Sequence, residues 1–296
     1  MAPPDLSWPD RKLLTLLRRL TICPTAAEHS AQYIGHRSKR RGVSIAAADA
    51  RAYVQGDDLR HLDWGQLAKF DQLVVRLFYA HHAMRVTIIL DCSASMALGS
   101  PRKFDFARSL AACLSIIALH GRNELKLLPA PSGRTAHCVT TSGGQDAAMA
   151  DILSLLKTLP PGGVMDMQKL LHRAARQKTD NLILISDCLP PQNLTKAFAA
   201  LAARSQRLIV LHTLCPEEQS PPFKHPVLLR DPELGRRQRI SASETASMAY
   251  RAAFARWRDE VSESVKRCGG VYRYISTSNS IEEVLAQHLA EVLFTQ

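Results

Sequence analysis

From Val86 onward, short apolar runs alternate with longer segments of helical character, and this alternation limits the fold more than any other feature of the chain. Such alternation is typical of a parallel sheet with helices on both faces. The sequence therefore predicts an α/β protein with a doubly wound, mostly parallel sheet. The predicted strands are 86–91, 124–129, 136–140, 182–186, 207–213 and 271–275, and the predicted helices are 103–120, 146–158, 166–177, 192–204, 243–268 and 281–294.

The N-terminal part of the chain does not follow this alternation. Apolar residues at helical spacing predict a helix from Asp10 to Leu20, and a strand-like run covers 73–78. Glycines and paired charges interrupt the pattern between them. We therefore expect a small N-terminal subdomain, residues 1–85, followed by an α/β domain, residues 86–296. A segment rich in proline and charge predicts a loop or exposed hairpin inserted around 221–240.

The strand predicted at 86–91 ends in the motif Asp91-x-Ser93-x-Ser95. The motif places one carboxylate and two hydroxyls on a tight turn at the carboxyl end of a buried strand. Hard oxygen ligands of this kind suit Mg²⁺, which accepts few protein ligands and keeps several waters. No G-x-S-x-G surrounds either serine, so the turn is not that of a catalytic serine. It is interpreted either as part of a metal site or as a strand end capped by a serine-rich turn.

A second motif lies upstream, between Gly35 and Lys69. Its defining residues are Arg51, Tyr53, Gly56, Asp57, Asp58, Arg60, Asp63 and Trp64. Gly-Asp-Asp is typical of a turn, the charged residues predict a charge-assisted network, and the tryptophan predicts a large buried anchor. We interpret this signature segment as an interface, or as the element that locks the N-terminal subdomain onto the sheet. The alternative is that its acids serve as general bases.

Together these motifs resemble a known family. The signature segment, the Asp91 turn, Lys103-x-Asp105-x-Ala107-Arg108 and Ile185-Ser186-Asp187 are similar to the bacterial family called domain of unknown function 58. In that family the signature precedes a von Willebrand factor A-like domain. The resemblance runs from about Gly35 to the C-terminus. It implies a von Willebrand factor A-like fold and makes Asp91, Ser93 and Ser95 the first element of a metal-ion-dependent adhesion site.

The resemblance also implies where the rest of such a site lies. Asp187 would face Asp91 across an open crevice at the carboxyl ends of the strands, where the strand order reverses. Two facing carboxylates raise one pKa unless a cation lies between them. The alternative is that both aspartates cap helices. Cys92 and Cys188, which follow them, are interpreted as core thiols rather than ligands.

One ligand of the adhesion-type site is missing from the sequence. The family supplies a threonine hydroxyl just before Asp166, where this chain has Met165. A thioether is a soft ligand and a poor substitute for a hydroxyl on Mg²⁺. Either Asp166 or a water would fill the gap. A Mg²⁺ site formed by Asp91, Ser93, Ser95, Asp187 and Asp166 is therefore expected to be weak or vestigial.

The net charge is +11, from 38 Lys and Arg against 27 Asp and Glu, and the excess is spread almost evenly along the chain. The one basic cluster, His36 to Arg41, has no recognised nucleic-acid-binding motif beside it. Sequence-specific nucleic-acid binding is therefore not expected. The charges of Lys39, Arg40 and Arg41 are interpreted as attracting an acidic partner.

The sequence also bears on where the protein works. No apolar run approaches the roughly 18 residues that span a bilayer, so no transmembrane segment is expected. No basic-then-apolar signal follows Met1. The seven cysteines lack the spacing of a disulfide framework. These features predict a cytoplasmic protein.

Two functions remain for such a chain. The resemblance implies a non-enzymatic protein-interaction module, accessory to a MoxR-type AAA+ ATPase and other von Willebrand A proteins in the assembly or maturation of a client protein. The alternative is a metal-dependent hydrolase that uses the Asp91–Asp187 crevice and the acids of the signature segment. Hydrolysis needs an activated water and a positioned base, and the sequence offers no second metal set or base histidine. We therefore expect the module and no enzymatic activity.

Overall fold

The computed structural model describes residues 11–22, 46–55, 62–79, 83–130, 136–138, 145–176, 178–189, 194–203, 205–221, 225–240 and 243–295. The chain divides into two compact units, one of residues 1–23 and 84–296 and one of residues 24–83. Leu13 and Leu17 of helix α1 (Arg11–Leu17) are buried in the core of the larger unit. The N-terminal helix and the signature segment, predicted as one subdomain, therefore fall in different units.

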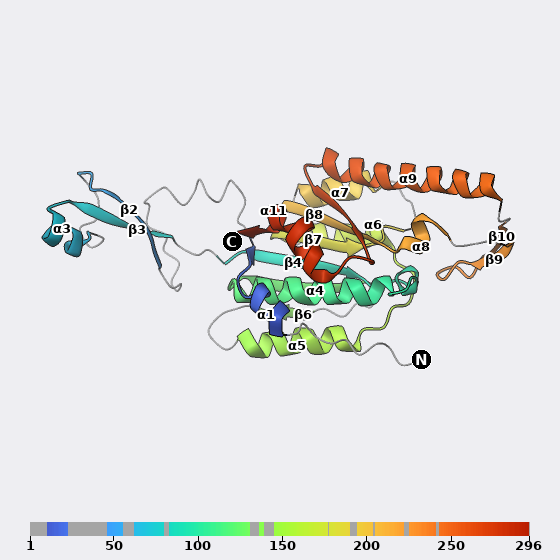
Figure 1. Ribbon diagram of the computed structural model, residues 1–296, viewed down its shortest axis with the longest axis horizontal. Coiled ribbons are helices and arrows are strands. Elements are labelled where there is room, and N and C mark those ends of the chain that lie inside the picture. Colours follow the sequence, from blue (N-terminus) through green and yellow to red (C-terminus); the bar gives the residue numbers. More distant parts are fainter. Residues whose placement is uncertain are drawn as a thin grey trace. The chain divides into compact units, whose positions relative to one another are not determined.

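A six-stranded sheet of order β11-β8-β7-β4-β5-β6 forms the centre of the larger unit (Figure 1). Its strands are β4 (Arg85–Asp91), β5 (Glu124–Ala130), β6 (Ala136–Cys138), β7 (Thr179–Ser186), β8 (Ser205–Leu214) and β11 (Val271–Ser276). All neighbours pair in parallel except β6, which is antiparallel to β5. The predicted doubly wound, mostly parallel α/β fold is confirmed, and β4 lies between β5 and β7 as its apolar run indicates.

Helices cover both faces of this sheet (Figure 1). They are α4 (Lys103–His120), α5 (Gln145–Thr158), α6 (Met167–Ala175), α7 (Thr195–Ala202), α8 (Pro216–Gln219), α9 (Glu244–Arg267), α10 (Ile281–Glu283), the π-helical η3 (Val284–Leu289) and α11 (Ala290–Leu293). Ser243 begins α9 because its side chain accepts a hydrogen bond from the N–H of Ala246, at 3.1 Å. No helix in the described part of the chain is both long and apolar enough to cross a membrane.

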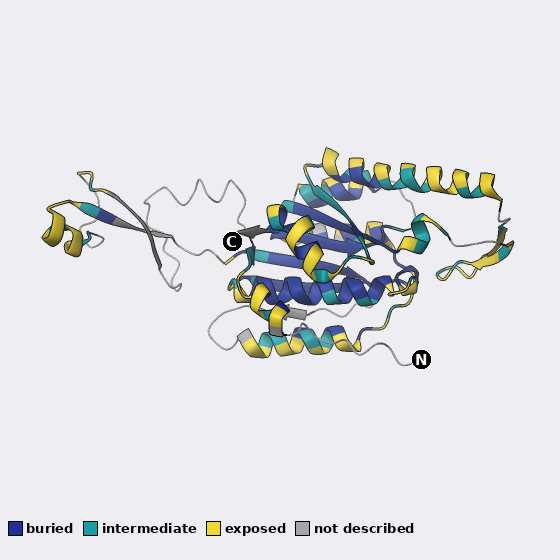
Figure 2. Cartoon of the chain, in the orientation of Figure 1, coloured by how far each residue is buried: buried dark blue, intermediate teal, exposed yellow. Residues whose placement is uncertain are grey.

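Two apolar cores follow from this arrangement. Ile88 and Leu90 of β4 contribute to the core that contains α1, α4, α5 and the C-terminal helices, whereas Ile89 contributes to the core that contains α6, α7 and α9. Successive strand residues point to opposite faces, so a strand covered on both faces is apolar throughout. Figure 2 shows α4 buried along nearly its whole length, which explains its almost continuous apolar sequence.

Two small antiparallel pairs lie outside the central sheet but within the larger unit. β1 (Thr21–Ile22) pairs with β12 (Phe294–Thr295), which joins the described N- and C-terminal segments. β9 (Val227–Arg230) pairs with β10 (Arg237–Ile240), in the segment predicted to contain a loop or hairpin. The second pair is a separate two-stranded sheet with mostly exposed residues.

The smaller unit is a hairpin with one short helix. β2 (Ala46–Ala52) pairs antiparallel with β3 (Val74–Tyr79), and α3 (Trp64–Phe70) lies between them in sequence. Asp63 caps α3, since its Oδ1 accepts hydrogen bonds from the N–H groups of Gly65 and Gln66. The strand-like run at 73–78 is therefore a strand, and part of the signature segment forms the helix that precedes it.

Candidate functional site

Asp91 lies at the carboxyl end of β4, and its side chain is buried, with an exposed fraction of 0%. Its Oδ1 accepts a hydrogen bond from the N–H of Ser93 at 2.8 Å, and its Oδ2 accepts one from the Ser186 hydroxyl at 2.6 Å. The Ser93 and Ser95 hydroxyls lie 2.9 Å apart and bond to each other. Both carboxylate oxygens and both serines therefore already have partners within the chain.

A buried lysine balances the second aspartate. The Nζ of Lys103, the first residue of α4, lies 2.7 Å from Oδ2 of Asp187 and 2.6 Å from Oε1 of Glu218 in α8. The side chains of Lys103 and Asp187 are 0% exposed and that of Glu218 is 14% exposed. Burial disfavours the ammonium, but the charges of Asp187 and Glu218 outweigh it and raise the pKa of Lys103. The lysine is therefore a fixed cation at neutral pH.

Asp91, Ser93, Ser95, Lys103, Asp187 and Glu218 are called the strand-end site below. Burial, and then the negative charge of Asp187, raise the pKa of Asp91 to about 7, against which the hydrogen bonds from Ser186 and Ser93 act. The sequence predicted that facing aspartates would raise one pKa, and Asp91 shows this shift. The predicted open crevice is wrong, because Asp91, Ser93 and Asp187 are fully buried and Ser95 is only 5% exposed.

His212 of β8 connects the strand-end site to the edge of the sheet. Its Nε2 lies 3.0 Å from the carbonyl oxygen of Asp187 and its Nδ1 lies 2.8 Å from the hydroxyl of Tyr272. A carbonyl oxygen only accepts, so Nε2 carries the proton and Nδ1 accepts from the tyrosine. Burial lowers the pKa of His212 to about 4. The imidazole is therefore neutral at pH 7 and bonded at both nitrogens, which leaves it unsuited as a general base.

Asp166, the candidate replacement ligand, is used differently. Its Oδ1 accepts the N–H of Lys169 at 3.0 Å, its Oδ2 pairs with the Lys169 ammonium at 3.0 Å, and its side chain is 46% exposed. Hydrogen bonds from Lys169 lower its pKa. Met165 is 3% exposed and packs in the second core. Asp166 therefore caps the start of α6 instead of joining the buried carboxylates.

The donor set of the strand-end site does not fit a resident Mg²⁺. Mg²⁺ demands nearly octahedral oxygen ligands at about 2.0–2.1 Å, with carboxylates free to bind it. Both oxygens of Asp91 accept protein hydrogen bonds, and Asp187 accepts one from the N–H of Leu189 and one from Lys103. Within the described residues, no group of three or more His, Cys, Asp or Glu is arranged to hold a metal ion. The ammonium of Lys103 already supplies a positive charge to Asp187 and Glu218.

Part of the signature segment can be placed. Trp64 lies at the start of α3 and is 63% exposed, so the hairpin and helix of its own unit do not bury it. Tyr53 donates its backbone N–H to the carbonyl of Leu73 at 2.8 Å, and Arg51 of β2 is paired with Val75 of β3. The remaining predicted residues lie outside the described part of the chain: Lys39, Arg40, Arg41, Gly56, Asp57, Asp58 and Arg60.

Sequence reasoning named Lys103 only as part of a family motif, and it named neither Glu218 nor His212. Lys103 carried a signal, since it is a charged residue at the start of a helix that is otherwise apolar along one long run. Glu218 gave no signal in the sequence, because its hydrogen bond with Lys103 joins residues 115 positions apart. The prediction that Cys92 and Cys188 are core thiols is confirmed, since each is 1% exposed and one lies in each apolar core.

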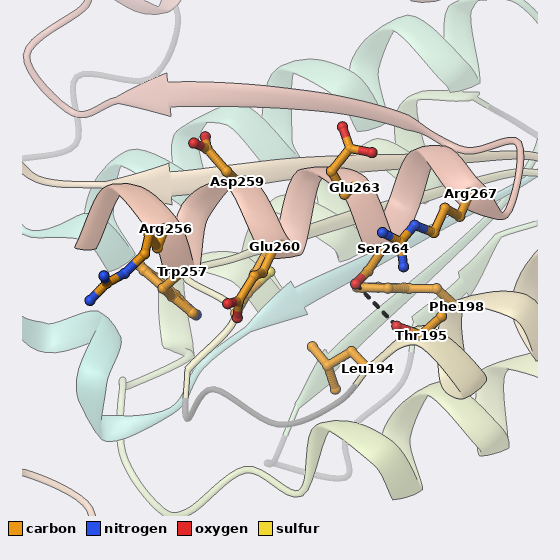
Figure 3. A pocket seen from close by; sticks show the side chains of 12 residues that line it. Leu194, Thr195, Phe198, Arg256, Trp257, Asp259, Glu260, Glu263, Ser264 and Arg267 are labelled. Atoms are coloured by element: carbon orange, nitrogen blue, oxygen red, sulfur yellow. Dashed lines mark hydrogen bonds between the residues drawn. The ribbon is translucent and has the colours of Figure 1, made fainter. Parts of the chain in front are cut away.

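A cavity of about 530 Å³ opens beside the strand-end site, between α7 and α9. Figure 3 shows Arg256, Glu260 and Arg267 of α9 on one side of the cavity and Leu194 and Phe198 on the facing segment at the start of α7. The hydroxyl of Thr195 donates to that of Ser264 at 3.1 Å and so links the two helices. The cavity is lined by both acidic and basic side chains, so its lining does not favour a ligand of one charge.

Comparisons with known proteins give relatives over most of the chain. The model of the family described as "Protein of unknown function DUF58" matches residues 49–263. Uncharacterized proteins of Mycobacterium bovis and Mycobacterium tuberculosis are each 26% identical over 267 residues, which covers 88% of this chain and 83% of the relative.

Two solved structures also resemble this chain. The conserved hypothetical protein BatB from Bacteroides thetaiotaomicron is 18% identical and has a TM-score of 0.44, covering 71% of this chain and 98% of its own. An aerotolerance-related membrane protein from Bacteroides fragilis is 17% identical and has a TM-score of 0.43, covering 71% of this chain and 100% of its own.

Proposed function

Because the chain belongs to the family described as protein of unknown function DUF58, we propose that it is a non-enzymatic protein-interaction module. Its role is accessory to a MoxR-type AAA+ ATPase, together with other von Willebrand A proteins, in the assembly or maturation of a client protein. The resemblance of its signature segment and Asp91 turn to that family supports this partner. A cytoplasmic location fits the same role.

The closure of the strand-end site carries the non-enzymatic part of the proposal. Asp91 and Asp187 are fully buried, and their carboxylates are bonded to Ser186, Lys103 and backbone N–H groups. A hydrolytic site needs an activated water and a base within hydrogen-bond reach of the substrate. His212, which bonds the carbonyl oxygen of Asp187, is neutral and bonded at both nitrogens. The geometry therefore favours a structural role for these acids over hydrolysis.

The same contacts support a proposal about the metal. We propose that the strand-end site binds Mg²⁺ weakly or not at all, because the Lys103 ammonium neutralises Asp187 and Glu218 from within the chain. A metal that displaced Lys103 would leave this buried ammonium without its carboxylate partners, and an uncompensated buried charge carries a large penalty.

Binding to the ATPase tests the module directly. The full chain, immobilised, should retain a purified MoxR-type AAA+ ATPase from the same genome, and the chain should not hydrolyse a phosphoester in the presence of Mg²⁺. Retention that is lost at high salt would show that surface charge contributes to the affinity of the complex. Mg²⁺-dependent turnover by the purified chain, without retention of the ATPase, would favour the hydrolase instead.

The basic cluster allows a second measurement on the same complex. Reversing the charges of Lys39, Arg40 and Arg41 should lower the association rate and its salt dependence more than it changes the dissociation rate. Surface plasmon resonance at two salt concentrations separates the two rates. An unchanged association rate would exclude the cluster from partner attraction.

A further inference from the structure

The β9–β10 hairpin presents one strongly basic face. Strand residues alternate between faces, and the register pairs Arg237 with Arg230 and Arg239 with Leu228. These four side chains therefore share one face of the hairpin, called the arginine face below. All four are exposed, and Leu228 is 61% exposed. Figure 2 shows the hairpin as an exposed element at one end of the larger unit.

The opposite face of the hairpin is partly buried at one end. Val227 and Ile240, which are paired in the register and share that face, are half-buried, whereas Leu229 and Gln238 farther along it are exposed. At the turn between the strands, Glu233 is half-buried and its pKa is raised by burial and by the charge of Asp187, while hydrogen bonding to Ser95 lowers it. The turn therefore lies against the strand-end site, and the arginine face is left toward solvent.

The charges of the arginine face are not balanced within the described chain. Arg230 and Arg237 lie directly opposite each other, a placement of like charges that destabilises a strand pair. Neither they nor Arg239 has an ion pair among the described residues. Asp231, the nearest acid along the chain, accepts the N–H groups of Glu233 and Leu234 in the turn. A negatively charged partner would relieve this repulsion.

We propose that the arginine face is a docking surface for an acidic segment of a partner protein, one with Asp or Glu residues interspersed with apolar ones. Carboxylates would pair with Arg230 and Arg237, for which bidentate contacts are the strong form, and an apolar side chain would cover Leu228. Three exposed leucines accompany the arginines on the hairpin, Leu228, Leu229 and Leu234. This inference rests on the proposed function, because it names the surface by which the module holds a protein.

A protein fits this surface better than a nucleic acid does. Proteins that hold single strands combine basic side chains with aromatic rings on which bases stack. The described hairpin residues, 225–240, contain no Phe, Trp or Tyr. They contain aliphatic side chains instead, which match the apolar positions of an amphipathic peptide strand.

Fluorescence anisotropy with a labelled peptide of alternating Glu and Val tests the surface. The wild-type chain should bind this peptide at low salt, and Arg230→Glu with Arg237→Glu should weaken binding at least about tenfold. The matched control is Lys178→Glu with Lys196→Glu, which changes net charge equally at two exposed lysines elsewhere and should change binding less than about twofold. Replacing both arginines by lysine should retain part of the affinity, because the charge remains and the fork is lost.

Several outcomes overturn this proposal. They are no binding of the peptide by the wild type at low salt, equal weakening by the control pair, or tighter hairpin-dependent binding of oligo-dT or phosphatidylserine vesicles than of the peptide. The variant with Arg230→Glu and Arg237→Glu and the lysine control pair are also tested for retention of the ATPase. If the wild type and the variant with both arginines replaced by Glu retain the ATPase equally, the proposed docking surface is wrong while the proposed module stands. If the wild type itself does not retain it, the proposed ATPase partner fails.

Discussion

The strand-end site and the β9–β10 hairpin lie next to each other but differ in whether their charged side chains form ion pairs. Lys103 is fully buried and pairs with two carboxylates of its own chain. Arg230 and Arg237 are exposed, face each other and have no described ion pair. Buried charges are costly unless paired, whereas exposed charges contribute little to stability and remain free for a partner. We infer that the first region determines stability and the second determines binding.

The largest effect is expected from Lys103→Met. The change leaves Asp187 and Glu218 without their cation in a buried site, and breaking such a pair costs about 3–5 kcal/mol. Denaturation by urea measures the loss. Lys169→Met removes an exposed lysine that also pairs with an aspartate and should change the free energy of unfolding by less than about 0.5 kcal/mol. Similar losses in the two variants would remove the contrast between buried and exposed pairs.

The next largest effect is a pH dependence carried by Asp91. Its folded pKa is raised to about 7 from an ordinary 3.8, so the folded state binds more protons than the unfolded state between these values. The contribution of Asp91 to the free energy of unfolding therefore falls as the pH rises through this window, by on the order of a few kcal/mol.

Asp91→Asn isolates this contribution. As the pH rises from 5 to 8, the free energy of unfolding of the variant should increase relative to that of the wild type, because the variant has no charge to bury at the higher pH. His212 acts in the opposite sense, since its lowered pKa makes stability fall as the pH drops below its ordinary value. Both chains share that histidine, so the difference between their unfolding curves removes it. A difference that does not vary with pH would contradict the raised pKa of Asp91.

A smaller effect is expected from Tyr272→Phe. The hydroxyl of Tyr272 donates to Nδ1 of His212, and its removal leaves a buried acceptor unpaired at a cost of about 1–3 kcal/mol. Tyr250→Phe is the control, because the hydroxyl it removes donates to the carbonyl of Glu218 at an exposed position. Thermal melts should place the Tyr250 variant close to the wild type. Equal losses would mean that burial does not distinguish the two hydroxyls.

The smallest effect on stability belongs to the hairpin. Arg237→Gln removes the repulsion with Arg230 and should raise stability by a few tenths of a kcal/mol, roughly the size of a cross-strand pair term. The same change should weaken binding of the acidic peptide. A gain in stability together with a loss of affinity would show that the like charges are kept for a partner. A loss of both would indicate that Arg237 stabilises the hairpin by other contacts.

The fold was predictable from sequence to a much greater extent than the site. The apolar run of β4 and the helical run of α4 are buried on all sides, so their composition alone marks their bounds. The roles of Asp91 and Asp187 as strand-end acids followed from the same runs. The cation between Asp187 and Glu218 did not, because it depends on where the start of α4 meets α8 after folding. Tertiary contacts of this kind leave no local pattern.

The signature segment shows that composition alone does not determine which side chains are buried. Its composition suggested a buried anchor at Trp64, yet that side chain is 63% exposed. An aromatic residue has a high average tendency to be buried, but the tendency does not say which surface covers it. Asp63 was more predictable, since an aspartate directly before a helix is a preferred N-cap.

Calorimetric titration of Mg²⁺ into chelator-stripped wild-type protein tests most directly whether the strand-end site supplies its own cation. The contacts of Lys103 with Asp187 and Glu218 predict no saturable heat at millimolar Mg²⁺. Lys103→Ser, which removes the ammonium and leaves space between the carboxylates, is predicted to gain Mg²⁺-dependent thermal stability that the wild type lacks. A single Mg²⁺ site in the wild type that disappears in Asp91→Ala, with the variant still folded, would contradict the account.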